Sequence, residues 1–255
     1  MSVLVGGVGE LFQSDLDVGR RAVDLLLTGQ LGPDVYIEEL HYGAVAVAQR
    51  LEELRPDWLL LIGAVEWGGR PGEVRRRVVR DLSPAPDDVQ AAVRDAAVGY
   101  VGIDLLLDVC AGFGALPSRT VLLEVEPART GPGDELSDET HAALLEVQGL
   151  VRTELARRPL LEVVAQLHER CAGDRLEPSE ALTTVRELLS ELDRLDETGQ
   201  WGAAFARRDR LRLQIAESHT SESMEHLDWA LWWALIEELD RLQPLDAGLA
   251  GTDRC

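Results

Sequence analysis

Short apolar runs alternate with helix-like segments in the first half of the chain. Val3–Val5, Val35–Leu40 and Trp58–Ile62 are predicted strands, and the third is apolar throughout. Fully apolar runs are typical of strands buried on both faces of a parallel sheet. Apolar residues recur at three- and four-residue steps over Gly19–Leu27 and Ala44–Leu54, which predicts a helix after each of the first two strands. This alternation predicts an α/β fold with a parallel sheet flanked by helices.

Further elements complete this predicted domain. The turn at Pro71–Gly72 leads into a predicted edge strand, and one long helix is expected over Asp87–Cys110. Thr120–Val125 is the last predicted central strand. Ser137 then precedes two acidic residues. This pattern begins a helix, because a Ser side chain caps the first turn and acids suit its positive end.

The strand pattern disappears after about Leu155. Helical spacing predicts four helices, at Pro159–Ala172, Pro178–Leu195, Trp201–Ser218 and Met224–Leu242. We therefore expect an α/β domain over residues 1–155 and an all-helical domain over residues 156–255. The last helix carries a leucine stripe and, beside it, three tryptophans that widen its apolar surface: Trp229, Trp232 and Trp233. Apolar patches of that size are uncommon on soluble monomers, so these side chains are candidates for packing or partner binding.

Composition narrows the possible partners. The chain has 255 residues and a formal net charge of −21. Such an acidic surface repels the phosphates that dominate nucleic-acid binding, and it repels anionic lipids as well. The three cysteines are widely scattered and no segment resembles a signal peptide or a membrane span. We therefore expect a cytoplasmic protein that binds neither nucleic acid nor membrane.

Four segments of the first 155 residues match, in order, the motifs of one protein family. The first is the strand, glycine turn and acidic loop from Val3 to Gly19. The others are Glu53–Ile62, the turn Arg70–Val74, and Glu124–Pro127 with the helix start that follows it. Together they resemble the hydrogenase maturation proteases of nickel–iron (NiFe) hydrogenases. The resemblance implies that family's α/β fold for residues 1–155.

The resemblance also implies a partner and a chemistry. Proteins of this family are nickel-dependent endopeptidases that act on the large subunit of a NiFe hydrogenase during its assembly. An acidic residue, an Asp and a His at the carboxyl ends of the sheet read nickel that the large subunit already holds. In this chain those positions are Leu16, Gly63 and Gly99, which have no donor side chain. We therefore expect a maturation factor with impaired proteolysis, a pseudoenzyme with no metal of its own, whose only nickel is the partner's.

Neighbouring acids leave other hypotheses open. Asp15, Asp17, Glu66 and Asp104 lie near the three positions and are candidates to line a cleft. A site with oxygen donors alone suits nickel less well than one that includes imidazole. An enzyme with a repurposed acidic cleft is one alternative, and a non-catalytic adaptor that binds through the tryptophan-rich helix is another. Dinucleotide binding is not expected, because Phe12 stands where that fingerprint has its third glycine.

Overall fold

The computed structural model describes the whole chain except residues 81, 97–101, 174–179, 200, 202–228 and 250–255. The chain divides into two compact units, Met1–Arg152 and Thr153–Cys255. The expected division near residue 155 rested on the loss of strand pattern and stays a prediction. Each unit has its own apolar core.

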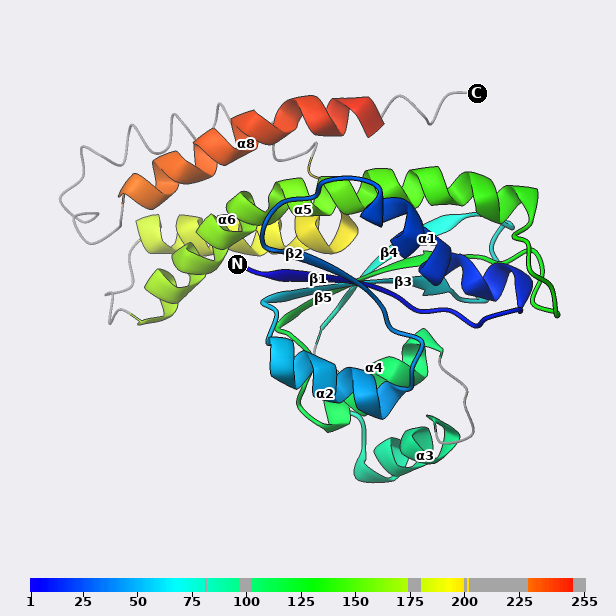
Figure 1. Cartoon of the computed structure of the whole chain (residues 1–255). Coiled ribbons are helices and arrows are strands. Elements are labelled where there is room, and N and C mark those ends of the chain that lie inside the picture. The colour runs from blue at the N-terminus through cyan, green and yellow to red at the C-terminus, as the bar shows by residue number, and fades with distance from the viewer. Residues whose placement is uncertain (81, 97–101, 174–179, 200, 202–228, 250–255) are drawn as a thin grey trace. The chain divides into compact units, whose positions relative to one another are not determined.

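The first unit is built on a five-stranded sheet with the order β2-β1-β3-β5-β4 (Figure 1). Its strands are β1 (Val3–Gly7), β2 (Val35–Glu39), β3 (Trp58–Ala64), β4 (Val74–Val79) and β5 (Arg119–Val125). The first, second, third and fifth strands run parallel. The predicted sheet flanked by helices is therefore confirmed.

Strand β4 departs from the expected all-parallel arrangement, because it pairs antiparallel with β5 at the edge of the sheet. The edge position was predicted, whereas the direction was not. The connection from β3 to β4 covers only residues 65–73, and a parallel crossover needs a dozen or more residues. The chain therefore reverses direction after β3 and forms β4 at the edge of the sheet, where β5 lies between β3 and β4.

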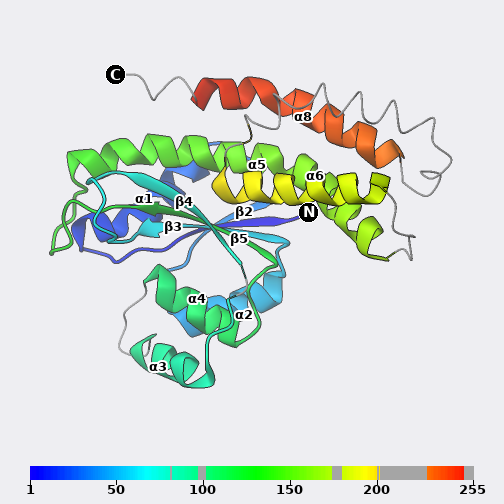
Figure 2. The ribbon, with the colours of Figure 1, turned by 180° about the vertical axis from the view of Figure 1, so that it is seen from behind.

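Helices cover both faces of this sheet (Figures 1 and 2). Helix α1 (Val18–Leu27) and the beginning of α5 (Asp138–Gly173) lie on one face. Helices α2 (Ala44–Leu54) and α4 (Ile103–Gly112) pack on the other, and α3 (Pro86–Ala96) lies beside them. The second face has a continuous core that joins side chains of β1, β3 and β5 to α2 and α4.

The long helix expected over Asp87–Cys110 is two helices, α3 and α4. The backbone of Gly102 is extended, with φ −87° and ψ 158°, so α4 begins anew at Ile103. Helical periodicity alone missed this break, because both helices bury apolar residues at helical spacing. Ala92 of α3 and Leu106 of α4 belong to the same core.

The second unit is helical in its described part. It contains the end of α5, then α6 (Glu180–Thr198) and α8 (Trp229–Leu249). The helices predicted after Ser137 and over Pro159–Ala172 are one helix, since α5 continues through Pro159. Pro159 is exposed, while Leu160 beside it is fully buried in the core, so packing holds the helix together across the proline.

The core of the second unit joins leucine stripes of three helices. Leu189, Leu192 and Leu195 come from α6 and Leu235 and Leu239 from α8, and they share this core with side chains of α5. The predicted helix over Trp201–Ser218 lies outside the described residues, as does the start of the helix predicted from Met224. Within the described part of the chain, the helices are too short or too polar to span a membrane.

Candidate functional site

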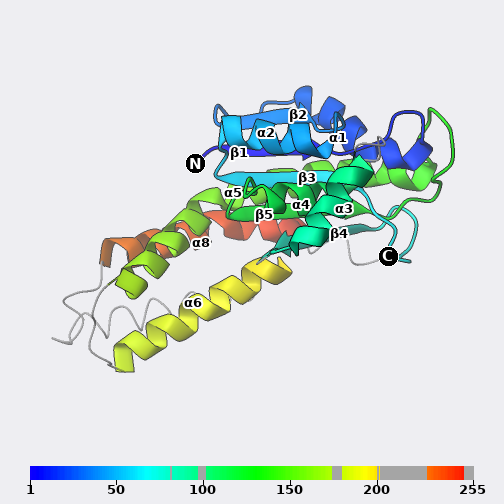
Figure 3. The same ribbon diagram turned by 90° about the horizontal axis from the view of Figure 1, so that it is seen from below.

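Three loops meet at the carboxyl edge of the sheet in the first unit. They follow β1, β3 and β5, and backbone hydrogen bonds join them. Val65 donates to the carbonyl of Val125 at 3.0 Å, and Ser14 donates to the carbonyl of Gly133 at 2.9 Å. Figure 3 shows the dark-blue loop after β1 beside the green loop after β5. The residues proposed from sequence as ligands or cleft acids come mainly from this region.

Asp15 fixes two of these loops to each other. Its side chain is fully buried in the short helix η1 (Ser14–Asp17). Oδ2 accepts hydrogen bonds from the amides of Ala128 and Arg129 and from the Ser137 hydroxyl, and Oδ1 accepts from the Ser137 amide at 2.6 Å. Burial alone raises the pKa of Asp15, but the hydrogen bonds from Ser137 and its neighbours outweigh it and lower the pKa below its ordinary value. Asp15 is therefore a structural carboxylate.

Asp17 forms ion pairs with two arginines of helix α1. It is 4% exposed, and its carboxylate accepts a hydrogen bond from Arg20 Nε at 2.8 Å and pairs with Arg21 Nε at 3.1 Å. Its negative charge also suits the positive N-terminal end of that helix. With both oxygens engaged by guanidinium groups, Asp17 does not present a free carboxylate to a ligand.

Glu66 and Asp104 are both exposed, and the structure does not unite them with the other two acids. Asp104 lies in the first turn of α4 with its side chain 72% exposed, and it pairs with Arg77 at 3.2 Å. Glu66 follows β3 at the carboxyl edge. Among the residues that the structure describes, no three His, Cys, Asp or Glu side chains come together as a metal site.

The space beside Gly63 is taken by an apolar side chain. A Cβ atom built on Gly63 would lie 2.8 Å from Ile103 Cδ1 and 3.0 Å from the carbonyl oxygen of Val8. Such distances are below ordinary contact, so an aspartate at this position requires Ile103 to move. Leu16 is half-buried in the loop after β1, which Asp15 joins to the loop after β5, whereas Gly99 lies outside the described residues. Nickel does not fit these residues, because Leu16 and Gly63 offer no donor and Ile103 occupies the space.

Two buried glutamates, one in β5 and one just after it, belong to a family motif in the sequence but were not predicted to be site residues. Glu124 is fully buried and binds Arg75 Nε at 2.7 Å and Arg77 Nη2 at 2.6 Å. Glu126 is 7% exposed and accepts hydrogen bonds from the amides of Trp67 and Gly69. The signal was present, since acids at alternate positions of an apolar strand require buried partners. Gly63 and Glu124 are register partners in neighbouring strands.

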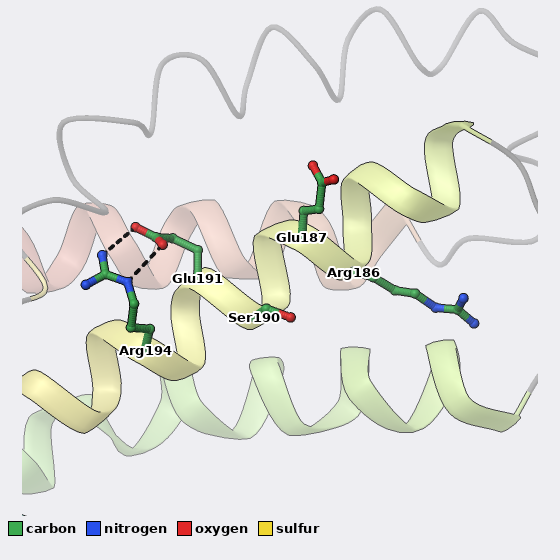
Figure 4. A pocket seen from close by; sticks show the side chains of 5 residues that line it. All are labelled: Arg186, Glu187, Ser190, Glu191 and Arg194. Atoms are coloured by element: carbon green, nitrogen blue, oxygen red, sulfur yellow. Dashed lines mark hydrogen bonds and ion pairs between the residues drawn. The ribbon is translucent and has the colours of Figure 1, made fainter.

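In the second unit, a hollow of about 540 Å³ lies along α6 (Figure 4). The described residues that line it come from that one helix: Arg186, Glu187, Ser190, Glu191 and Arg194. Glu191 and Arg194 satisfy each other through two hydrogen bonds of 2.8 and 3.1 Å, and Arg186 and Glu187 are exposed. A row of charges on one helix face does not define a ligand, so we do not assign a site there.

The tryptophans proposed for partner binding lie on α8. Trp233 is 46% exposed, so its ring is only partly covered in this chain. The leucine stripe of the same helix is buried, with Leu235 and Leu239 at 0%. The side chains of Trp229 and Trp232 lie outside the description. The helix therefore packs through its leucines and leaves Trp233 partly accessible.

The first unit is thus an α/β protein in which the buried carboxylate of Asp15 joins the loops after β1 and β5, and in which Leu16 and Gly63 offer no donor side chain. No protein-family model matches the sequence, and no curated protein matches it either. Solved structures do match. A hydrogenase 2 maturation peptidase from a Thaumarchaeota archaeon is 28% identical, with a TM-score of 0.44, over 59% of this chain and 96% of its own.

Two other solved structures carry related descriptions. The NiFe hydrogenase maturation protease HycI from Thermococcus kodakarensis KOD1 is 20% identical, with a TM-score of 0.47, over 60% of this chain and 91% of its own. The hydrogenase maturating endopeptidase HybD from E. coli is 21% identical, with a TM-score of 0.43, over 59% of this chain and 90% of its own. The chain is thus similar to hydrogenase maturation proteases, the family whose motifs the sequence resembles.

Proposed function

We propose that this protein is a maturation factor that binds the large subunit of a NiFe hydrogenase during its assembly without cleaving it through a nickel-reading site. The collinear motifs of residues 1–155 support the partner. The observation that supports the absence of cleavage is the packing of Ile103 against Gly63. Ile103 Cδ1 lies 2.8 Å from the position that a Cβ atom on Gly63 would occupy. An apolar side chain therefore replaces the polar surroundings that metal reading requires.

The acids near these positions also support binding rather than cleavage. Asp15 and Asp17 already hold the loop after β1 in place, through amides of the loop after β5 and through arginines of α1. A carboxylate that accepts several hydrogen bonds is poorly available to a metal ion or a catalytic water. The scaffold of the edge is thus retained as a rigid contact surface, while the ligands are absent.

Co-purification with a hydrogenase large subunit from the same genome tests this function. The large subunit is prepared with and without its C-terminal extension, and we expect the extended form to be retained. The mass of the nickel-loaded extended subunit is then followed during incubation with this protein, and we expect no change. Failure to retain either form contradicts the proposed partner, and a loss of mass contradicts the absence of cleavage.

A second candidate function is an adaptor that binds its partner through α8, favoured by the partial exposure of Trp233. Trp233→Ala discriminates between the two in the same assay. If the adaptor hypothesis is right, this variant loses the large subunit. If contact is made by the carboxyl edge of the first unit, Trp233→Ala retains it and substitutions at that edge do not.

A further inference from the structure

The loop after β1 displays two large apolar side chains at the carboxyl edge of the sheet. Leu11 is 47% exposed and Phe12 is 68% exposed. The backbone here is unusual, since Phe12 has φ +63° and Ser14 has φ +49°. Residues with a bulky side chain rarely adopt the left-handed region, because Cβ approaches the backbone too closely. We refer to Leu11 and Phe12 as the tip.

A network of hydrogen bonds holds the tip in this conformation. Gly133 donates to the carbonyl of Phe12 at 2.9 Å and accepts from the amide of Ser14 at 2.9 Å, while Glu10 donates to the carbonyl of Leu16 at 3.1 Å. Gly133 has no room for a side chain, since an added Cβ would lie 2.6 Å from Ser14 Oγ. The buried Asp15 carboxylate completes the network from the next position in the chain.

The conformation of the tip contributes little to the fold. Both side chains remain largely outside the core, so they add little burial in exchange for the left-handed backbone. Backbone strain of this kind persists where the surroundings over-determine it, and it concentrates at functional sites. A loop that presents a Phe and a Leu on a hydrogen-bonded backbone has the properties of a binding contact, because its backbone is already held in one conformation before association.

We propose that the tip docks into an apolar pocket on the hydrogenase large subunit, and this proposal rests on the function proposed above. The argument for this occupant is continuity. Leu16, the position at which the resemblance places a residue facing the large subunit, lies in the same clamped loop, and its carbonyl closes the loop onto Glu10. A partner that reaches Leu16 therefore meets the tip as part of one rigid surface.

The charges around the tip indicate the chemistry of the pocket's rim. Glu10, Asp134 and Glu135 flank the loop contacts, and Arg21 and Arg129 bind the backbone carbonyls of Asp134 and Glu135 at 2.9 and 3.1 Å. Arg21 is already paired with Asp17, so these acids outnumber the arginines and the surroundings of the tip are acidic, as is the chain as a whole at −21. We expect an apolar pocket in a basic surface of the partner, with charge acting mainly on the rate of association.

Phe12→Asn tests the tip with little change to the backbone, because asparagine tolerates the left-handed region. We expect the dissociation constant for the extended large subunit to rise at least tenfold, with an unchanged thermal midpoint of the full chain. Phe113→Asn is the matched control, since Phe113 is another exposed phenylalanine, 50% exposed, at the end of α4. It should bind within about twofold of the unchanged protein.

Each outcome bears on a different conclusion. Tight binding by Phe12→Asn, within twofold of the unchanged protein, overturns the role of the tip and leaves the proposed function standing. Absence of binding by the unchanged protein overturns both. If Phe12→Asn does not fold, Leu11→Asn takes its place, because Leu11 has an ordinary backbone conformation. Equal weakening by Phe113→Asn also contradicts a specific contact at the tip.

Discussion

Asp15→Asn is the substitution that most directly tests the clamp between the loops after β1 and β5. The asparagine oxygen can take the place of Oδ2 and keep the three hydrogen bonds from Ala128, Arg129 and the Ser137 hydroxyl. Its amide group then faces the Ser137 amide, which donates to Oδ1 at 2.6 Å in the native chain. Two donors meet in a fully buried place, so one bond is lost and the N–H groups on both sides of this contact are left unpaired.

The magnitude follows from the kind of bond that is lost. A hydrogen bond to a charged group contributes about 1.5–3 kcal/mol, and a buried donor left unpaired costs about 1–3 kcal/mol. Both figures describe the same contact and are therefore not summed. We expect the free energy that holds the two loops together to fall by about 3 kcal/mol. This corresponds to roughly a hundredfold change in an equilibrium constant.

Hydrogen exchange measures this loss locally, which matters because a chain with two compact units need not unfold in one step. The amides of Ala128, Arg129 and Ser137 should lose about a hundredfold of their protection in Asp15→Asn. Asp24→Asn is the control, since Asp24 has a side chain 51% exposed and only a 3.5 Å pair with Arg20. It should change stability by less than about 0.5 kcal/mol. Equal protection in both variants refutes the clamp.

The same substitution has a defined pH dependence. The pKa of Asp15 in the folded chain lies below the ordinary value of 3.8. A carboxylate with a lowered pKa stabilises the fold above its unfolded pKa, and that contribution is lost as pH falls through the folded pKa. The difference between the unchanged protein and Asp15→Asn should therefore be constant from neutral pH down to about pH 5 and shrink below about pH 4. A difference that grows on acidification contradicts this assignment.

Three further predictions concern packing and reactivity. Gly63→Ala should lower the free energy of unfolding by about 1–3 kcal/mol, because the new methyl group overpacks against Ile103. In denaturant unfolding, the double variant Gly63→Ala with Ile103→Ala should lose less than the sum of the two single variants. Strict additivity argues against the contact. Trp233→Ala should cost less than about 1 kcal/mol because the ring is partly exposed, whereas Leu239→Ala in the core should cost about 2–5 kcal/mol; the reverse order argues that Trp233 packs internally. Burial raises the pKa of Cys110 to about 12, so iodoacetamide at pH 8 should modify it only after unfolding, as mass spectrometry of native and denatured samples will reveal.

Local patterns in the sequence were sufficient to predict most strands and helices of the first unit. The apolar runs gave the parallel strands because a strand buried on both faces has few polar positions, and Trp58–Ala64 is such a strand. The absence of donor side chains at Leu16 and Gly63 was also visible in the sequence. No packing can give a leucine or a glycine a metal ligand, so this conclusion did not depend on the fold.

The tertiary structure decided what periodicity does not encode. The direction of β4 depends on the short connection that brings it back beside β5, and the break before Ile103 is visible only in the extended backbone of Gly102. Similarly, Asp15 was a candidate cleft acid until its partners were known, and its hydrogen bonds to Ser137 join residues 122 positions apart in the chain. A carboxylate looks the same in a sequence whether it meets solvent, an arginine or four donors, because its role is set by groups that only folding brings to it.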